Sequence, residues 1–350
     1  MGLSAKERMT TTSSSDTETF DPPGVGSGSG GLGPSAISHF VTAFDAIAHN
    51  METVVRGKPV VVRQALLCLL AQGHLLVEDV PGVGKTTVAK ALAQSIDAKW
   101  GRIQFTADLL PADVTGLSIW KRDSATFEFR KGPIFNNIVL ADEINRSSPK
   151  TQSALLEAMA EEQVTVDGHS YQLPEPFMVV ATQNPVESEG TYPLPESQLD
   201  RFLMRISVGY PRRTDELSIL ETHEQRHLVD ALNPVATAKD LVTMINMVKK
   251  VTIAPELRGY LVDLAEATRI HPSLELGMSP RATLSLQQVS RAHALASQRA
   301  YVIDDDIKAV ASSVISHRLM LRPEAELQGT DTDRVVADVL DSVPVPYDRM

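Results

Sequence analysis

The chain has 350 residues, of which 43% are hydrophobic and 22% are charged, and its formal net charge is −11. This length and composition indicate a globular protein that is large enough for two hydrophobic cores. The negative charge opposes a phosphate backbone, so we expect no sequence-independent binding to nucleic acid.

Cysteine usage and hydropathy indicate the cellular compartment of the protein. Cys68 is the only cysteine, so no internal disulfide can form, and its place in the apolar run 65–70 predicts a buried, reduced thiol. No apolar stretch approaches the roughly 18 residues that a membrane-spanning helix needs. The N-terminus also has no apolar signal-peptide core. We therefore expect a cytoplasmic protein with no membrane span.

Three regions follow one another along the chain. Residues 1–35 are rich in Ser, Thr and Gly, which predicts a disordered tail. Residues 36–211 alternate between strand and helix signals, which predicts an α/β core with a parallel sheet flanked by helices. Residues 212–350 predict an all-α domain. Its expected helices span 240–251, 255–269, 280–299, 304–319 and 333–341.

The first chemical motif is a Gly-rich turn between a predicted strand at 73–80 and a predicted helix at 87–96. Backbone N–H groups and the helix macrodipole at such a turn cradle phosphate. We expect Lys85 to reach the β- and γ-phosphates and Thr86 to bind Mg²⁺. Asp79 stands where the general P-loop pattern has its first glycine. The residues expected to bind the nucleotide are Pro81, Gly82, Val83, Gly84, Lys85, Thr86 and Thr87.

Two further apolar runs end in polar residues that suit the same chemistry. The run 137–141 precedes Asp142 and Glu143, and the run 177–181 precedes Asn184. Buried parallel strands present such residues at their carboxyl ends, where nucleotides bind in α/β folds. We expect Asp142 to hold Mg²⁺, Glu143 to polarise the attacking water and Asn184 to position it. The alternatives are an acidic helix start and a strand-ending turn.

Candidate arginines lie further along the chain. Arg201 follows Asp200, and Arg205 comes soon after. Arginine spreads phosphoryl charge in a transition state and can be supplied by a neighbouring subunit, so Arg201 is the first candidate and Arg205 the second. A surface salt bridge between Arg201 and Asp200 is the alternative. Arg281 lies in the first turn of a predicted helix, where an anionic partner such as ATP would offset the macrodipole.

Three segments could contribute a different function. Residues 119–129 and 164–173 alternate around turns and predict two hairpins, which would either contact a client or cover the core. Trp120 and Tyr171 are the first client contacts to test. His223 and His227 fit a zinc-binding H-E-x-x-H pattern. A third ligand is not evident, so a solvated helix face is the preferred interpretation.

Taken together, these motifs resemble the AAA+ ATPases, and more narrowly the MoxR family, from about residue 37 to residue 346. The resemblance is carried by residues 76–86, 141–146, 150–159 and 279–282. It implies Walker A roles for Lys85 and Thr86, Walker B roles for Asp142 and Glu143, and sensor 1 for Asn184. It also implies a trans arginine finger at Arg201 and sensor 2 at Arg281. The chain departs from the family at 55–58, where Val-Arg-Gly-Lys replaces Val-Gly-Gln.

The resemblance further implies an ATP- and Mg²⁺-dependent hydrolase in a hexameric ring that remodels, assembles or matures client proteins. A protein with a von Willebrand A domain is the expected partner. Two other functions stay open. A transcription activator or helicase would need a DNA-binding module, which the sequence does not show. An ATP-gated scaffold without turnover would not need Glu143, Asn184 and Arg201 together.

Overall fold

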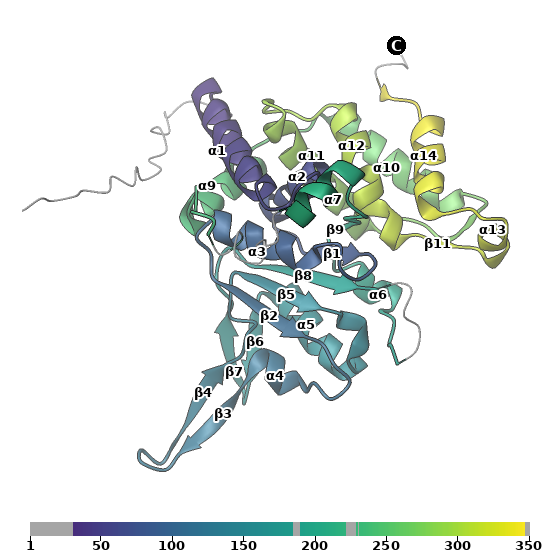
Figure 1. Cartoon of the computed structure of the whole chain (residues 1–350). Helices are drawn as coiled ribbons and strands as arrows, with labels where there is room; N and C mark the ends of the chain where they lie inside the picture. The colour runs from purple at the N-terminus through teal and green to yellow at the C-terminus, as the bar shows by residue number, and fades with distance from the viewer. Residues whose placement is uncertain (1–30, 185–189, 222–228, 230, 347–350) are drawn as a thin grey trace, which may run out of the picture.

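A parallel five-stranded sheet lies at the centre of the computed structural model, which describes residues 31–184, 190–221, 229 and 231–346 (Figure 1). The strands run in the order β2-β5-β8-β1-β9, and every pair is parallel. Their carboxyl ends therefore meet at one edge of the sheet. The strands are β1 (Leu75–Glu78), β2 (Trp100–Gln104), β5 (Ile138–Asp142), β8 (Met178–Gln183) and β9 (Met204–Ile206).

Both faces of the sheet are covered, which explains the unbroken apolar runs of its central strands. Alternate residues of one strand enter different cores, because successive side chains of a strand point to opposite faces. Leu75 and Val77 belong to one buried cluster, whereas Leu76 belongs to a second. The buried histidine His74 precedes β1. Its Nδ1 accepts from the Val179 N–H at 3.0 Å, so its Nε2 carries the proton and donates to a backbone carbonyl of a helix that covers the sheet.

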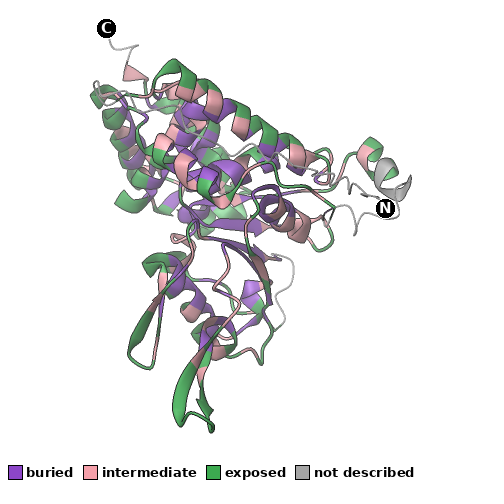
Figure 2. Cartoon of the chain, turned by 90° about the vertical axis from the view of Figure 1, so that its left-hand side faces the viewer, coloured by how far each residue is buried: buried purple, intermediate pink, exposed green. Residues whose placement is uncertain are grey.

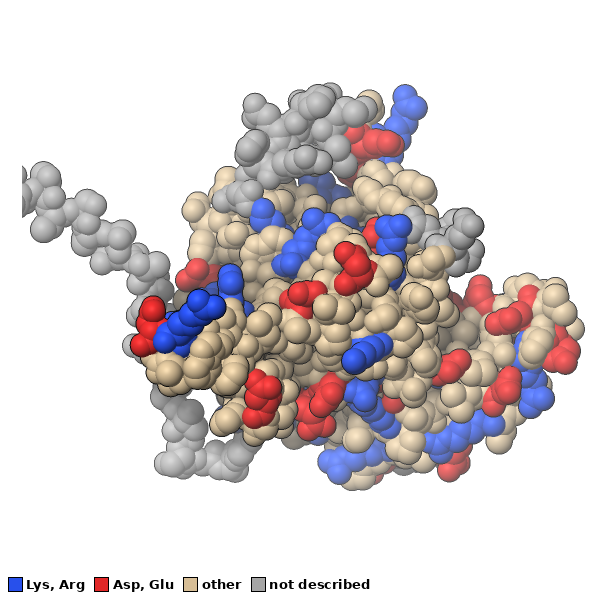
Figure 3. Space-filling model, turned by 90° about the horizontal axis from the view of Figure 1, so that it is seen from below, with Lys and Arg blue, Asp and Glu red and all other residues tan. Residues whose placement is uncertain are grey.

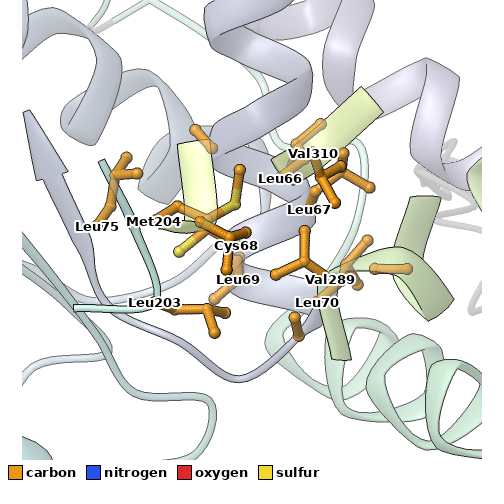
Figure 4. Close-up of a cluster of buried hydrophobic side chains, with 14 of the residues drawn as sticks. Leu66, Leu67, Cys68, Leu69, Leu70, Leu75, Leu203, Met204, Val289 and Val310 are labelled. Carbon is orange, nitrogen blue, oxygen red and sulfur yellow. The ribbon is translucent and has the colours of Figure 1, made fainter. Parts of the chain in front are cut away.

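Three helices cover the first face: α1 (Pro34–Glu52), α2 (Pro59–Leu70) and α3 (Lys85–Ser95). Proline stands in the first turn of α1 and of α2, where its missing N–H leaves no helical bond unmade. The prediction that Cys68 is buried is confirmed, and burial raises the pKa of its thiol. Figure 4 shows Cys68 of α2 among leucines of the same helix and residues of β1, β9 and the C-terminal helices.

The second face carries α4 (Pro111–Thr115), α5 (Pro149–Glu161) and α6 (Glu196–Leu199). Two antiparallel hairpins extend from this side, and Figure 2 shows much of their surface exposed. They are β3 (Gly116–Lys121) with β4 (Thr126–Lys131), and β6 (Gln163–Val166) with β7 (His169–Gln172). Both predicted hairpins are confirmed. Asp167 and Gly168 have φ of 51° and 77°, the left-handed pair of values that a tight hairpin turn requires.

The C-terminal region is helical, as predicted, and forms a lid beside the first face (Figure 1). The α11 helix begins with Ser279 as its N-cap, whose Oγ accepts from the Ala282 N–H at 3.1 Å. The lid also contains a short antiparallel pair, β10 (Leu274–Leu276) and β11 (Met320–Leu321), too short to give a periodic signal. Its helices are α7 (Arg213–Glu221), α9 (Ala238–Lys249), α10 (Pro255–Ile270), α11 (Pro280–Ala296), α12 (Asp304–Ile315), the 3₁₀ turn η2 (Ser316–Arg318), α13 (Pro323–Leu327) and α14 (Thr332–Ser342).

Some sequence predictions concern residues outside the described part of the chain. His223 and His227 lie there, as does most of the tail, while α1 begins at Pro34. Among the described residues, no helix combines the length and the apolar character needed to cross a membrane. Viewed from below, the face that carries the hairpins has acidic and basic side chains interspersed (Figure 3). This described face therefore shows mixed charge.

Candidate nucleotide-binding site

The Gly-rich turn joins the end of β1 to the start of α3. Gly82 and Gly84 have φ of 83° and 93°, values that residues with a side chain rarely adopt. A Cβ at Gly82 would meet nothing within 4 Å, so the backbone conformation, and not space, requires the glycine. Gly84 is the N-cap of α3, and the helix begins at Lys85. The turn therefore places the N–H groups of a helix start directly after β1, at the carboxyl edge of the sheet, as anion binding requires.

Lys85 lies at the carboxyl edge between β1 and β8. Its Nζ donates to the carbonyl oxygens of Asp79 at 2.5 Å and Gln183 at 3.2 Å. In the register of these strands Glu78 pairs with Gln183, so Asn184 follows at the level of Asp79. Asn184 is buried. The structure thus brings the P-loop lysine and the predicted sensor amide to the same edge.

The two acids that end β5 are held by one threonine of β8. Thr182 donates from Oγ1 to Asp142 Oδ1 at 2.7 Å, and the same Oγ1 accepts from the Glu143 N–H at 2.9 Å. Glu143 adopts left-handed backbone, with φ 56° and ψ 50°. For a residue with a side chain this conformation costs about 1–3 kcal/mol, and such residues cluster at functional sites. The bond from Glu143 to Thr182 holds this conformation in place.

Two residues of β2 that the sequence motifs did not predict contact these acids. Arg102 donates to Asp142 Oδ2 from Nη2 at 2.6 Å and from Nε at 3.1 Å. Gln104 donates from Nε2 to Glu143 Oε2 at 3.0 Å, and this oxygen also accepts from Arg146 Nη1 at 3.0 Å. Both acids are therefore partnered by donors of the same chain. The sequence signal that could have identified them is the alternation of polar Arg102 and Gln104 around Ile103, which is buried.

Asp79, the departure from the P-loop pattern, ties the turn to the end of β9. Its Oδ2 accepts from the Gly209 N–H at 2.6 Å and from Ser207 Oγ at 2.9 Å, and its Oδ1 accepts from the Val80 N–H at 2.8 Å. Burial raises the pKa of this carboxyl, but hydrogen bonds from Gly209, Ser207 and Val80 outweigh that effect and lower the pKa below its ordinary value. Asp79 is therefore a charged anchor of the turn.

A cavity of about 690 Å³ opens beside the turn, within the range of volumes that hold small ligands. Val55, Arg56 and Lys58, from the segment 55–58 that departs from the family, line it, together with apolar residues near the start of the lid. This wall could contact a base. The described lining comprises Val54, Val55, Arg56, Lys58, Gly82, Val83, Gly84, Thr86, Thr87, Lys90, Arg102, Val208, Pro211 and Val229.

The three predicted arginines lie elsewhere, since none belongs to the described lining of this cavity. Arg281 is exposed in the first turn of α11. Arg201 donates from Nη1 to the Leu156 carbonyl at 2.6 Å. Arg205 pairs with Glu78 of the same chain at 3.0 Å. Asp200 contacts Arg318 of the lid at 2.9 Å.

The donor set of the cavity suits Mg²⁺. Thr86 lines the cavity, and Asp142, at the end of β5, contacts Arg102 of the same lining, so both residues offer the hard oxygen ligands that this ion prefers. In the described part of the chain, no group of three or more His, Cys, Asp or Glu side chains is placed to hold a metal ion by itself. Mg²⁺ commonly uses one carboxylate together with phosphate and water, so the residues present fit this ion.

Comparisons with known proteins agree with this geometry. Residues 74–204 match the family described as ATPase family associated with various cellular activities (AAA), and residues 266–339 match the AAA lid domain. A solved structure from Cytophaga hutchinsonii, named only as a candidate ATPase, has a TM-score of 0.83 and 38% identity. The similarity covers 88% of this chain and 96% of that one. The fold and the site thus define a AAA+ ATPase with its lid.

Curated relatives narrow the class. The chain is 51% identical to the uncharacterized protein YeaC of Bacillus subtilis, over 87% of this chain and 95% of that protein. It is 36% identical to chaperone MoxR1 of Mycobacterium tuberculosis, over 90% and 85%. Protein MoxR of Paracoccus denitrificans is 30% identical, over 89% and 99%. The chain belongs to the MoxR family of AAA+ ATPases, as its motifs predicted.

Proposed function

We propose that this ATPase is Mg²⁺-dependent and uses hydrolysis to remodel, assemble or mature client protein complexes. The observation that carries the proposal is the meeting of the P-loop, the β5 acids and Asn184 at one sheet edge beside a cavity of nucleotide size. The turn is exposed to half-buried, whereas Asp142 and Asn184 are buried, and the low local dielectric around buried groups strengthens their electrostatic contacts.

Each residue has a distinct part in this proposal. Lys85 and the N–H groups of the turn, which comprises Pro81, Gly82, Val83, Gly84, Thr86 and Thr87, bind and orient the phosphates. Thr86 and Asp142 hold Mg²⁺, which neutralises phosphate charge when bound. Glu143 polarises the attacking water, and Asn184 positions it. Since Arg102 contacts Asp142 Oδ2 and Gln104 contacts Glu143 Oε2, we expect both contacts to open when the site is loaded.

Arg201 supplies the finger to a neighbouring subunit in a hexameric ring. Its absence from the described cavity lining supports a role in trans, as does its position near the end of α6. Arg205 is engaged by Glu78 within its own chain, so Arg201 stays the first candidate. Arg281 acts as sensor 2 from the lid. Its position at the start of α11 allows the lid to respond to phosphate.

The client-binding role rests on the hairpins and on the relative that is named a chaperone. Trp120 is 50% exposed and Phe127 is 71% exposed, and their rings meet edge to face with centroids 5.0 Å apart. Tyr171 instead stacks on Phe129 with centroids 4.1 Å apart, so it ties the two hairpins together. We propose that the Trp120 face contacts the client, with a von Willebrand A domain protein as partner.

Paired variants test the catalytic assignment. Lys85→Ala should abolish nucleotide binding, because its ammonium contacts the ground-state phosphates. Glu143→Gln should retain binding and stop turnover, because the amide cannot accept a proton from water. Titration with a fluorescent ATP analogue and measurement of phosphate release separate the two effects. Glu157→Gln, an exposed change on α5, is the matched control.

Three outcomes would contradict the proposal. Unchanged nucleotide binding by Lys85→Ala would refute the P-loop assignment. Turnover by Glu143→Gln equal to that of the unchanged protein would assign the chemistry to another group. Nucleotide binding by the unchanged protein without turnover at any Mg²⁺ concentration would indicate an ATP-gated scaffold.

A further inference from the structure

A buried arginine of the lid reaches the loop that carries Arg201. Arg318, in η2, is 6% exposed, and its Nε lies 2.9 Å from Asp200 Oδ1. Its Nη2 donates to the Phe202 carbonyl at 2.7 Å. The lid therefore contacts the residues immediately before and after Arg201. Contacts of this kind fix a backbone segment, because a planar guanidinium offers several donors in a rigid arrangement.

The neighbouring histidine strengthens this contact. His317 Nε2 lies 3.0 Å from the same Phe202 carbonyl, and this nitrogen must donate because the carbonyl only accepts. Burial lowers the pKa of His317 well below its ordinary value, so the ring is neutral and keeps this single donor in place. Burial also lowers the pKa of Arg318, to about 10, which leaves the guanidinium charged at neutral pH.

The other side of Arg318 contacts the helix that begins with Arg281. Its Nη2 donates to Ser285 Oγ at 3.2 Å, and Ser285 lies one turn after Arg281 on α11. Its Nη1 donates to the Val314 carbonyl of α12 at 2.8 Å. One guanidinium thus joins the two lid helices to the loop at 200–202. A movement of α11 relative to the sheet must strain or break these contacts.

The side chain of Arg201 has a separate anchor on the core. Its Nη1 donates to the Leu156 carbonyl, while its backbone N–H donates to the Gln198 carbonyl at 3.2 Å. The core therefore holds the side chain and the preceding turn, whereas the lid holds the flanking residues Asp200 and Phe202. The position of the guanidinium depends on both halves of the chain.

We propose that Arg318 is a positioning residue through which the lid of each subunit sets the geometry of its own Arg201, and so controls hydrolysis in the neighbouring subunit. The inference rests on the proposed trans role of Arg201. A subunit whose lid is displaced would present a displaced finger, so the nucleotide state of one site would be passed to the next. Such coupling needs two arrangements of one element that both sites influence, and the lid with its Arg318 contacts provides that element.

Mixed assemblies of two inactive variants test this coupling. Lys85→Ala subunits retain a finger but bind no nucleotide, and Arg201→Ala subunits bind nucleotide but lack the finger, so their mixture should recover turnover. Arg318→Met is then added to one partner at a time. In the finger donor it should lower kcat by about tenfold or more, since small misplacements of a catalytic group have such effects. KM for ATP should not change. In the nucleotide-binding partner, Arg318→Met should leave both values unchanged.

Each pattern of results is decisive. A lower kcat when Arg318→Met is in the finger donor alone supports the inference. Equal loss in both partners, or loss only in the nucleotide-binding partner, overturns it, because Arg318 would then act through lid stability or through its own site. No loss in either partner also overturns it. No recovery in the starting mixture, at any ratio in assembled rings, refutes the trans role of Arg201 itself and the inference with it.

Two further variants test the inference even if Arg318→Met prevents the lid from folding. Asp200→Asn removes the charged partner of Arg318 from the core side, and should give the same donor-only loss without altering the lid. Arg318→Lys keeps the charge but not the fork, so it should recover only part of the activity. Arg322→Met is the matched control. Its Nε donates to the Leu274 carbonyl within the lid at 3.0 Å, so it should show no difference between partners.

Discussion

Replacing Asp79 with the glycine of the general P-loop pattern should weaken this protein. The φ of Asp79 lies outside the left-handed region, so the backbone here does not require glycine. The carboxylate accepts from the Gly209 N–H, Ser207 Oγ and the Val80 N–H. Each hydrogen bond to a charged group contributes about 1.5–3 kcal/mol, but some of these donors can turn to water, so we count about 2–4 kcal/mol in all. Glycine adds about 0.5–1 kcal/mol of backbone entropy.

The measured effect should be a fall in melting temperature of about 3–7 °C, because the unfolding entropy of a 350-residue chain makes each kcal/mol worth about 1.4 °C. Differential scanning calorimetry of Asp79→Gly, Asp79→Asn and the unchanged protein provides the measurement. The asparagine variant should fall between the other two, because it keeps one acceptor oxygen. Asp123→Gly, in the exposed turn between β3 and β4, is the matched control. A melting temperature for Asp79→Gly equal to or above that of the unchanged protein would refute this reasoning.

Three further predictions concern other contacts. Arg102→Met should lower the Mg²⁺ concentration for half-maximal turnover by about fivefold, because it removes the partly exposed ion pair with Asp142, which contributes about 1 kcal/mol. A Mg²⁺ midpoint equal to or higher than that of the unchanged protein would contradict this. Trp120→Ala should reduce client-stimulated phosphate release but not basal release. Tyr171→Ala should have the same effect and should also lower the free energy of unfolding by about 1 kcal/mol, measured in urea. Full client stimulation of both variants would exclude the hairpins as the client surface. Burial raises the pKa of Asp306, but hydrogen bonds from Arg299 and other donors outweigh this effect and hold the pKa below its ordinary value, so its contribution to stability is present at neutral pH and is lost as the pH falls through that lowered pKa. In urea, the difference in stability between the unchanged protein and Asp306→Asn should shrink below about pH 4, and a difference independent of pH would contradict this.

The central strands could be predicted because they are buried on both faces. Their apolar runs are continuous, and each ends in a polar or Gly-rich segment, so β1, β5 and β8 were expected where they occur. The two edge strands were not predicted. The edge strand β2 is only partly buried, and β9 has three residues, so neither gives a run that stands out from loop sequence.

The candidate site likewise contains residues that could be predicted from the sequence and residues that could not. Motif residues such as Lys85 and Asp142 could be predicted, because their chemistry requires particular side chains at short spacings. Their partners could not, since those contacts depend on tertiary structure. Arg102 is 40 residues from Asp142, and Gly209 is 130 residues from Asp79. The role of each motif residue stays a prediction until the variants are measured.

The boundary between the two buried clusters has a consequence for the order of folding. The first cluster joins Leu66 and Leu75, made early in synthesis, to Val289 and Val310 of the lid, made late (Figure 4). Among the residues that the structure describes, the second cluster draws only on the range 76–202. A chain leaving the ribosome can therefore complete the hairpin side of the sheet first. The side that bears α2 keeps apolar surface exposed until α11 and α12 have been synthesised, so the P-loop half gains its full stability only when the lid docks.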